Sequence, residues 1–300
     1  MQLLRNSAKP KPYLLIRRTD KNIGLGSYIL LNLGHIHYAV ENNMIPVVDM
    51  QSYPNTYLEN HEVGKVNAWE LYFRQPANIG VADVKLRDCR VVDTAPAFVP
   101  CDNMDFLTNH KLVQYWQKFT RKYLVLTKEI QAHMDEVYLN ITGGSEKRIL
   151  GVLCRGTDYL STKPYGHPVQ PEVDDVMAKA EQVMKQYNCS YLYLATEDKG
   201  ILDRFREKFG DRLLYNSAMR YGDTQDKRLS EFRFNRDRDA YLKGLEYLES
   251  LVILSRCNCL IGGRTNGSLC ALMMSEGYEY QYFWNLGRYR LDDKYSILSP

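Results

Sequence analysis

Short apolar runs alternate along this chain with longer segments in which apolar residues recur at helical spacing. In the first half, strands are predicted at residues 13–17 and 46–50, separated by a helix that begins near Ser27 and ends at Asn42. In the second half, strands are predicted at 149–154, 190–195, 213–215, 258–262 and 281–284, and helices at 172–187, 199–209, 240–256 and 269–274. Strands that alternate with helices favour parallel sheets, so the pattern predicts an α/β fold.

The stretch between the two regular regions is less periodic. Residues 67–73 predict a short helix, residues 89–93 a strand, and residues 109–139 one long helix. A polar, glycine-rich segment follows that helix and is typical of a hinge. We therefore expect two Rossmann-like, doubly wound domains, 1–145 and 146–300, that face each other across a cleft.

Composition and charge limit the classes of protein to which this chain can belong. The 300 residues are 45% hydrophobic and 25% charged, which is ordinary for a globular protein, and a net charge of +3 is too small to predict nucleic-acid binding. The seven cysteines include no CxxC pair, which favours reduced thiols over disulfides or a metal site. No apolar run predicts a signal peptide or a transmembrane segment. We expect a cytoplasmic protein, either free or peripheral to the inner membrane.

Three strands of the second half end in polar clusters. These clusters are Arg155-Gly156-Thr157-Asp158, Thr196-Glu197-Asp198 and Arg264-Thr265-Asn266-Gly267-Ser268. Parallel strands bring them to one carboxyl edge, where open α/β folds bind ligands. The guanidinium of Arg155 suits a phosphate, and the third cluster opens a helix whose N–H groups attract an anion. We expect Arg155 and that helix start to clamp a pyrophosphate, with Glu197 or Asp198 on hydroxyls of a ribose or base.

Each of these polar residues also has a structural alternative. Asp158 can cap a turn, Asp198 can cap the following helix, and Ser268 can supply a capping hydroxyl. Their joint placement at one sheet edge favours a ligand site.

Two further motifs leave alternatives open. Gly24 and Gly26 either shape a tight turn or let the backbone approach a ligand, but Ile29 breaks the GxGxxG dinucleotide fingerprint. Asp237 and Asp239 match a metal-binding DxD pattern. They lie among arginines before a helix, which favours a solvated cap and no metal site.

Several of these segments resemble the fucosyltransferase superfamily, which includes α1,6-, Nod-factor, α1,2- and protein O-fucosyltransferases. The matching segments are Arg155-Gly-Thr-Asp158, His167-Pro168, Tyr193-Leu-Ala-Thr-Glu-Asp198, Leu254-Ser-Arg-Cys and Arg264-Thr-Asn-Gly-Ser268. The resemblance implies a GT-B fold, GDP-fucose as donor, inversion at the anomeric carbon, and no metal or other cofactor. It also implies that Arg155 contacts the donor diphosphate and that the first domain binds a glycan or surface-polysaccharide acceptor.

The chain also departs from the family's pattern. Leu153 stands where the motif has its histidine, Gly156 where it has a second arginine, and Lys163 where α1,6 members have an acidic residue proposed as base. An inverting displacement needs a proton acceptor near the acceptor hydroxyl. Asp158 is the first candidate and His167 the second. A non-catalytic sugar-binding module and a transferase with another nucleotide-sugar donor stay open as alternatives.

Overall fold

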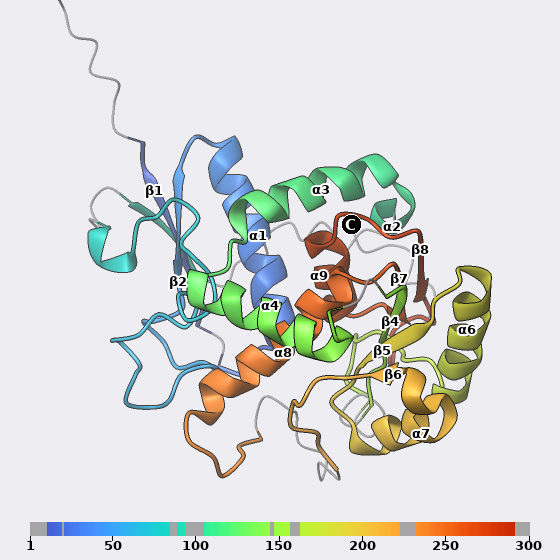
Figure 1. Ribbon diagram of the computed structural model, residues 1–300. Helices are drawn as coiled ribbons and strands as arrows, with labels where there is room; N and C mark the ends of the chain where they lie inside the picture. The colour runs from blue at the N-terminus through green and yellow to red at the C-terminus, as the bar shows by residue number, and fades with distance from the viewer. Residues whose placement is uncertain are drawn as a thin grey trace, which may run out of the picture.

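Two parallel sheets form the framework of the computed structural model (Figure 1). The structure describes residues 11–19, 21–84, 105–144, 147–156, 163–222 and 232–291, together with the backbone of 89–93. The first sheet has the order β2-β1-β3, and the second has the order β6-β5-β4-β7-β8. The strands are β1 (Tyr13–Arg17), β2 (Ile45–Asp49), β3 (Cys89–Asp93), β4 (Ile149–Leu153), β5 (Tyr191–Ala195), β6 (Leu213–Leu214), β7 (Cys259–Gly263) and β8 (Tyr280–Trp284). All neighbouring strands within these two sheets are parallel, as the sequence predicts.

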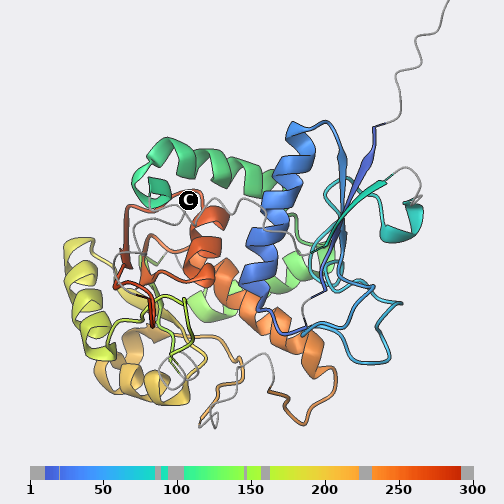
Figure 2. The same cartoon turned by 180° about the vertical axis from the view of Figure 1, so that it is seen from behind.

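Helices cover both sheets, and three of them lie between the sheets. Figures 1 and 2 show α1, α8 and α9 between the two sheets, and α6 and α7 on the outer side of the five-stranded sheet. The helices are α1 (Leu25–Glu41), α2 (Asp105–Thr108), α3 (His110–Tyr123), α4 (Lys128–Thr142), α6 (Val173–Gln186), α7 (Lys199–Phe209), α8 (Asp239–Ser255) and α9 (Asn266–Met274), with short 3₁₀ turns η1 (Val81–Asp83) and η3 (Gly210–Arg212). The described part of the chain contains no helix both long and apolar enough to span a membrane.

The apolar run before Arg155 forms β4, the central strand of the second sheet. Every residue of β4 is buried because β5 and β7 flank it and helices cover both faces. A strand in that position has no solvent face, so it has no alternating polar residues. Its carboxyl end therefore delivers Arg155 to the middle of the sheet edge.

Hydrogen bonds from side chains to the backbone override two of the expected helices. The predicted helix at 109–139 is wrong: α3 ends at Tyr123, and the side chain of Thr127 caps a separate helix, α4, by accepting from the N–H of Ile130. The predicted helix at 67–73 is a set of turns, because the Asn67 side chain hydrogen bonds to the backbone of Val48. Asn and Thr bind backbone groups readily, and this competes with helix continuation.

Two predicted helix starts are also displaced. Ser27 does not cap α1; the N-cap is Gly24, and Ser27 is the third helical residue. Thr265 caps α9 by accepting from the N–H of Ser268, so this helix begins at Asn266 and not at residue 269. Both helix starts therefore lie nearer to the sheet edge than expected.

The largest hydrophobic core cluster joins the two halves of the sequence. It contains residues of α1, α3 and α4 together with residues of α8 and α9. Two further contacts join the halves. Tyr72 stacks on Tyr241 with ring centroids 5.6 Å apart, and the Gln117 amide donates a hydrogen bond to the carbonyl of Leu272 at 3.1 Å. The domain division at residue 145 stays a prediction. Its predicted hinge, residues 140–147, overlaps the end of α4, whose left-handed C-cap is Gly143.

Candidate functional site

A cavity of about 470 Å³ lies at the carboxyl edge of the second sheet. Its lining combines the ends of β4, β5 and β7 with the start of α1 and one side of α8. Most of the residues singled out in the sequence line it, namely Gly24, Gly26, Arg155, His167, Glu197, Thr265, Asn266 and Gly267. The structure thus brings together groups that are more than 240 positions apart in the chain.

Arg155 and Glu197 form an ion pair inside this cavity. Nε of Arg155 lies 3.3 Å from Oε1 of Glu197, and the two side chains are only 19% and 16% exposed. The Gly156 N–H donates to the same carboxylate at 2.9 Å. A carboxylate held by a cation and a backbone N–H is oriented, and it orients the guanidinium in turn.

Gly156 is constrained by its neighbours. A Cβ at this position would lie 2.5 Å from the carboxylate oxygen of Asp198 and 2.7 Å from Ile201. The second arginine of the fucosyltransferase motif therefore does not fit here unless the start of α7 moves. Gly156 therefore stands in place of the motif's arginine because Asp198 and Ile201 leave no room for a side chain.

Asp198 and Ser268 lie at helix starts and outside the cavity lining. Asp198 caps α7 by accepting from the N–H of Ile201 at 2.9 Å. Ser268 is fully buried and donates to the carbonyl of Gly263 at 2.7 Å. Both side chains position the backbone of the site, which corresponds to the structural alternatives raised by the sequence.

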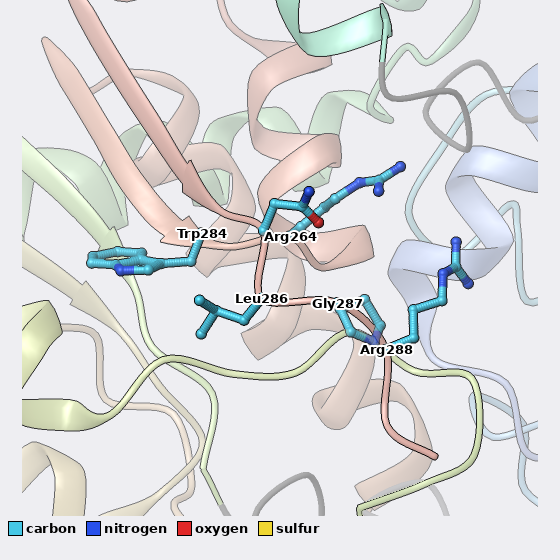
Figure 3. Close-up of a pocket in the computed structure, with 7 residues that line it drawn as sticks. Arg264, Trp284, Leu286, Gly287 and Arg288 are labelled. Carbon is cyan, nitrogen blue, oxygen red and sulfur yellow. The ribbon is translucent and has the colours of Figure 1, made fainter. Parts of the chain in front are cut away.

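Arg264 lines a second, much smaller hollow, of about 10 Å³, beside the cavity (Figure 3). Such a volume is comparable to the space needed by one water molecule. In Figure 3 the side chains of Arg264 and Arg288 extend to one side of the chain, and Trp284 and Leu286 to the other. Arg264 is therefore next to Thr265 at the edge of the site but does not line the main cavity.

Of the two candidate bases, only His167 lies among the described residues. Asp158 lies outside the described residues. His167 lines the cavity within a tight turn, in which its N–H donates to the carbonyl of Pro164 at 3.1 Å. Gly166, at φ +73°, allows the turn, because L side chains rarely adopt that conformation.

The N-termini of two helices meet at the cavity. The Asn266 amide of α9 donates to the Ser27 hydroxyl of α1 at 2.7 Å. At Gly24 a Cβ would meet nothing within 4 Å, so this backbone is open to close approach. First-turn N–H groups lack intrahelical acceptors and, with the helix dipoles, favour an anion here.

Helix α8 supplies a wall that we did not identify from the sequence. Lys243, Glu246, Tyr247, Ser250 and Leu251 line the cavity from this helix. Their spacing of three and four residues places them on one helical face, which was the available signal. Burial, together with the nearby Arg233 charge, lowers the pKa of the Lys243 amine to about 8.

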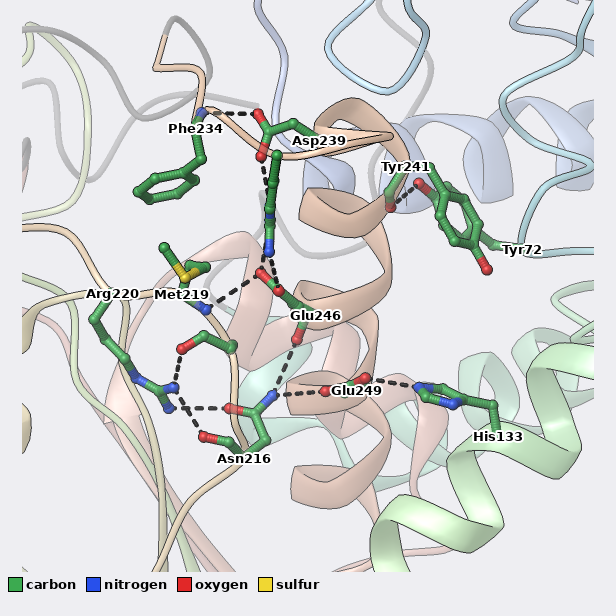
Figure 4. Close-up of polar contacts among 12 residues, drawn as sticks. Tyr72, His133, Asn216, Met219, Arg220, Phe234, Asp239, Tyr241, Glu246 and Glu249 are labelled. Carbon is green, nitrogen blue, oxygen red and sulfur yellow. Dashed lines mark hydrogen bonds and ion pairs between the residues drawn. The ribbon is translucent and has the colours of Figure 1, made fainter.

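Hydrogen bonds and ion pairs hold the described residues of the charged segment that precedes α8. Arg220 donates to Asn216, and Arg236 contacts both Asp239 and Glu246 (Figure 4). Asp239 is the first residue of α8 and is buried, with its carboxylate accepting from Arg236. The described residues contain no group of three or more His, Cys, Asp or Glu side chains arranged to hold a metal.

Tyr221 joins this segment to the sheet edge. Its N–H donates to the carbonyl of Glu197 at 2.8 Å, and its carbonyl accepts from Lys199 at 2.9 Å. Burial raises the pKa of the Tyr221 phenol, so this cavity-lining hydroxyl stays protonated. The segment therefore acts as a fixed wall of the site at its described positions.

No protein-family model matches this chain, and a comparison with curated proteins finds no match. Among solved structures, it is similar to the fucosyltransferase NodZ from Bradyrhizobium, with a TM-score of 0.53 and 16% identity over 89% of this chain and 94% of that chain. NodZ α-1,6-fucosyltransferase has also been soaked with GDP-fucose, and that structure gives a TM-score of 0.52 and 16% identity over 88% and 93%.

Two solved structures with lower sequence identity also have a similar fold. An Arabidopsis thaliana FUT1 variant in complex with GDP gives a TM-score of 0.55 and 10% identity over 96% of this chain and 72% of that chain. POFUT1 in its apo form gives 0.53 and 10% identity over 92% and 99%. These similarities confirm the α/β, GT-B-like fold of fucosyltransferases that the sequence predicts.

Proposed function

We propose that this protein transfers fucose from GDP-fucose to a hydroxyl of a glycan or surface-polysaccharide acceptor. The observation that carries the proposal is the cavity that Arg155 lines together with the N-termini of α1 and α9. The fold supports it, because NodZ, which has a similar fold, has been soaked with GDP-fucose. In this proposal the donor is a substrate, and the protein needs no metal or other cofactor.

The positive groups of the cavity suit a diphosphate. The Arg155 guanidinium offers a permanent charge and several N–H donors, and the two helix starts add backbone N–H groups. Glu197 keeps Arg155 oriented and can accept from a hydroxyl of the donor. This charge stabilises the GDP leaving group and takes the role that a metal has in other transferases.

The reaction in this proposal is a single displacement with inversion. The acceptor oxygen bonds to the anomeric carbon while the bond from that carbon to the diphosphate oxygen breaks, and GDP leaves with the electron pair. The acceptor proton passes to a base, for which Asp158 and His167 are the candidates. His167 lines the cavity and can reach a bound acceptor directly or through one water.

The two halves of the chain would divide the substrates between them. Residues 146–300 carry Arg155, Glu197 and the start of α9 for the donor, and Gly24 and Gly26 at the start of α1 also contact the donor. The rest of residues 1–145 binds the acceptor. Buried free thiols, such as those of Cys154 and Cys259, fit the cytoplasmic location that forms part of this proposal.

One observation favours a different donor or a binding-only role. Leu153 lines the cavity at the position where fucosyltransferases have a histidine, so an apolar side chain replaces a polar one beside the ligand. A panel of nucleotides distinguishes a guanine preference from a uridine preference. Tight donor binding without turnover on any acceptor would favour the binding module.

The proposal is tested by titrating the protein with GDP-fucose in a calorimeter and following fucose release or transfer. We expect binding, followed by transfer to one member of a glycan panel or slow hydrolysis. Absence of GDP-fucose binding would refute the proposal. Asp158→Asn and His167→Asn, compared in kcat and KM, identify the base, because its loss lowers kcat far more than donor affinity.

A further inference from the structure

Tyr247, in the middle of α8, lies where the starts of α1 and α9 meet. A Cβ at Gly26 would be 3.0 Å from its phenolic oxygen, and a Cβ at Gly267 would be 2.7 Å from it. Each glycine is the second residue of its helix. The phenol therefore contacts the first turn of both helices, and both positions need glycine to leave room for it.

The surroundings of this phenol oxygen favour an anion. Gly26 and Gly267 line the same cavity as Tyr247 and Arg155. The starts of two helices line that cavity, and Arg155, which is paired with Glu197, adds the N–H donors of its guanidinium. A phenol hydroxyl is a donor as well as an acceptor, so it can turn its O–H toward an anion held by these groups.

We propose that Tyr247 is a donor-binding residue whose hydroxyl donates a hydrogen bond to the diphosphate of the nucleotide sugar, an inference that rests on the proposed function. The diphosphate gains negative charge as its bond to the sugar breaks. A hydrogen bond to it therefore strengthens toward the transition state. Tyr247 assists both the binding of the donor and the departure of GDP.

The test is Tyr247→Phe, which removes one oxygen and keeps the ring. We expect GDP affinity to fall about tenfold to hundredfold, the range for a hydrogen bond to a charged group. Affinity for guanosine, which has no phosphate, should not change. Calorimetry gives the GDP affinity, and competition against GDP gives the guanosine affinity.

The matched control is Tyr241→Phe on the same helix. Tyr241 stacks on Tyr72 and does not line the cavity, so both affinities should stay at their original values. Gly267→Ala provides a second variant, because its Cβ displaces the Tyr247 hydroxyl without removing it. We expect the same loss of GDP affinity, again without a change for guanosine.

The outcomes separate this inference from the proposed function. If the unmodified protein binds GDP and Tyr247→Phe binds it equally well, the inference is wrong and the proposed function stands. An equal loss of GDP and guanosine affinity would mean that the hydroxyl only maintains the shape of the cavity, which also overturns the inference. A protein that binds no GDP at all overturns the proposed function itself.

Discussion

Two arginine–glutamate pairs flank the cavity and are built in different ways. Arg155 meets Glu197 through one ion-pair contact of 3.3 Å, and both side chains line the cavity. Arg236 forks onto Glu246 with contacts of 2.5 and 3.1 Å and also contacts Asp239 at 2.7 Å. Arg155 and Glu197 both line the cavity, whereas Arg236 lies outside its lining and holds the wall residue Glu246 and the buried Asp239 together. The difference predicts a loss of binding in one case and a loss of stability in the other.

The largest effect is expected from Arg155→Ala. Loss of the charged contact to the donor diphosphate should lower kcat/KM by roughly 30-fold to 1000-fold, which corresponds to about 2–4 kcal/mol. The midpoint of thermal unfolding should change little, because the side chain faces the cavity. Steady-state kinetics and a melting curve check both parts. A variant with normal kinetics would remove Arg155 from the mechanism.

Arg236→Ala should show the reverse behaviour. It leaves Glu246 without its guanidinium partner and Asp239, which is only 3% exposed, as a buried carboxylate that loses its ion pair. Breaking such a cluster should lower the free energy of unfolding by about 2–4 kcal/mol, measured by urea denaturation. GDP affinity of the folded variant should stay within about twofold.

The control for this prediction is Arg256→Ala. Arg256 pairs with the exposed carboxylate of Asp135 at 2.6 Å, and such surface pairs contribute less than about 1 kcal/mol. If Arg256→Ala destabilises the protein as much as Arg236→Ala, the difference between a buried cluster and a surface pair is not what matters here.

The sequence predicts which polar groups meet at the carboxyl edge of the second sheet, because strands that alternate with helices run parallel. Once β4, β5 and β7 are parallel neighbours, Arg155 and Glu197 must meet at one edge. Whether a side chain then points into the cavity or caps a helix depends on the first turn of the helix. Adjacent residues differ for this reason: Glu197 lines the cavity, and Asp198 caps α7.

The α8 wall could not be predicted in the same way. Lys243 and Tyr247 sit one turn apart on a helix with many apolar positions, and no strand end or motif marks them. Their role depends on α8 packing between the two sheets, which is a long-range tertiary feature (Figure 2). The break before α4 has a local cause, since α3 ends at Tyr123 and the side chain of Thr127 caps a new helix.

The contrast between Glu197 and Asp198 gives a smaller, sharper test. Asp198→Ala removes the cap of α7 and should cost about 1 kcal/mol of unfolding free energy, with GDP affinity nearly unchanged. Glu197→Gln should instead lower GDP affinity by about tenfold, because Arg155 loses the charge that orients it, with less effect on stability. Equal losses of GDP affinity in both variants would mean that the two positions act as one unit.

The smallest effect is expected at Lys243, the cation on the α8 wall. Its pKa is about 8 in the folded protein and 10.5 in its ordinary state, because burial and the charges of Arg233 and Arg236 outweigh the attraction of Asp239 and Glu59. Between pH 8 and 10.5 the unfolded chain therefore binds a proton that the folded protein does not, so the Lys243 contribution to stability rises with pH. Lys243→Met should raise stability by less than about 1 kcal/mol below pH 8, because solvent screens part of the amine. The difference should shrink as the pH approaches 10.5, and a difference that stays constant in melting curves from pH 7 to 10 would contradict a desolvated amine on this wall.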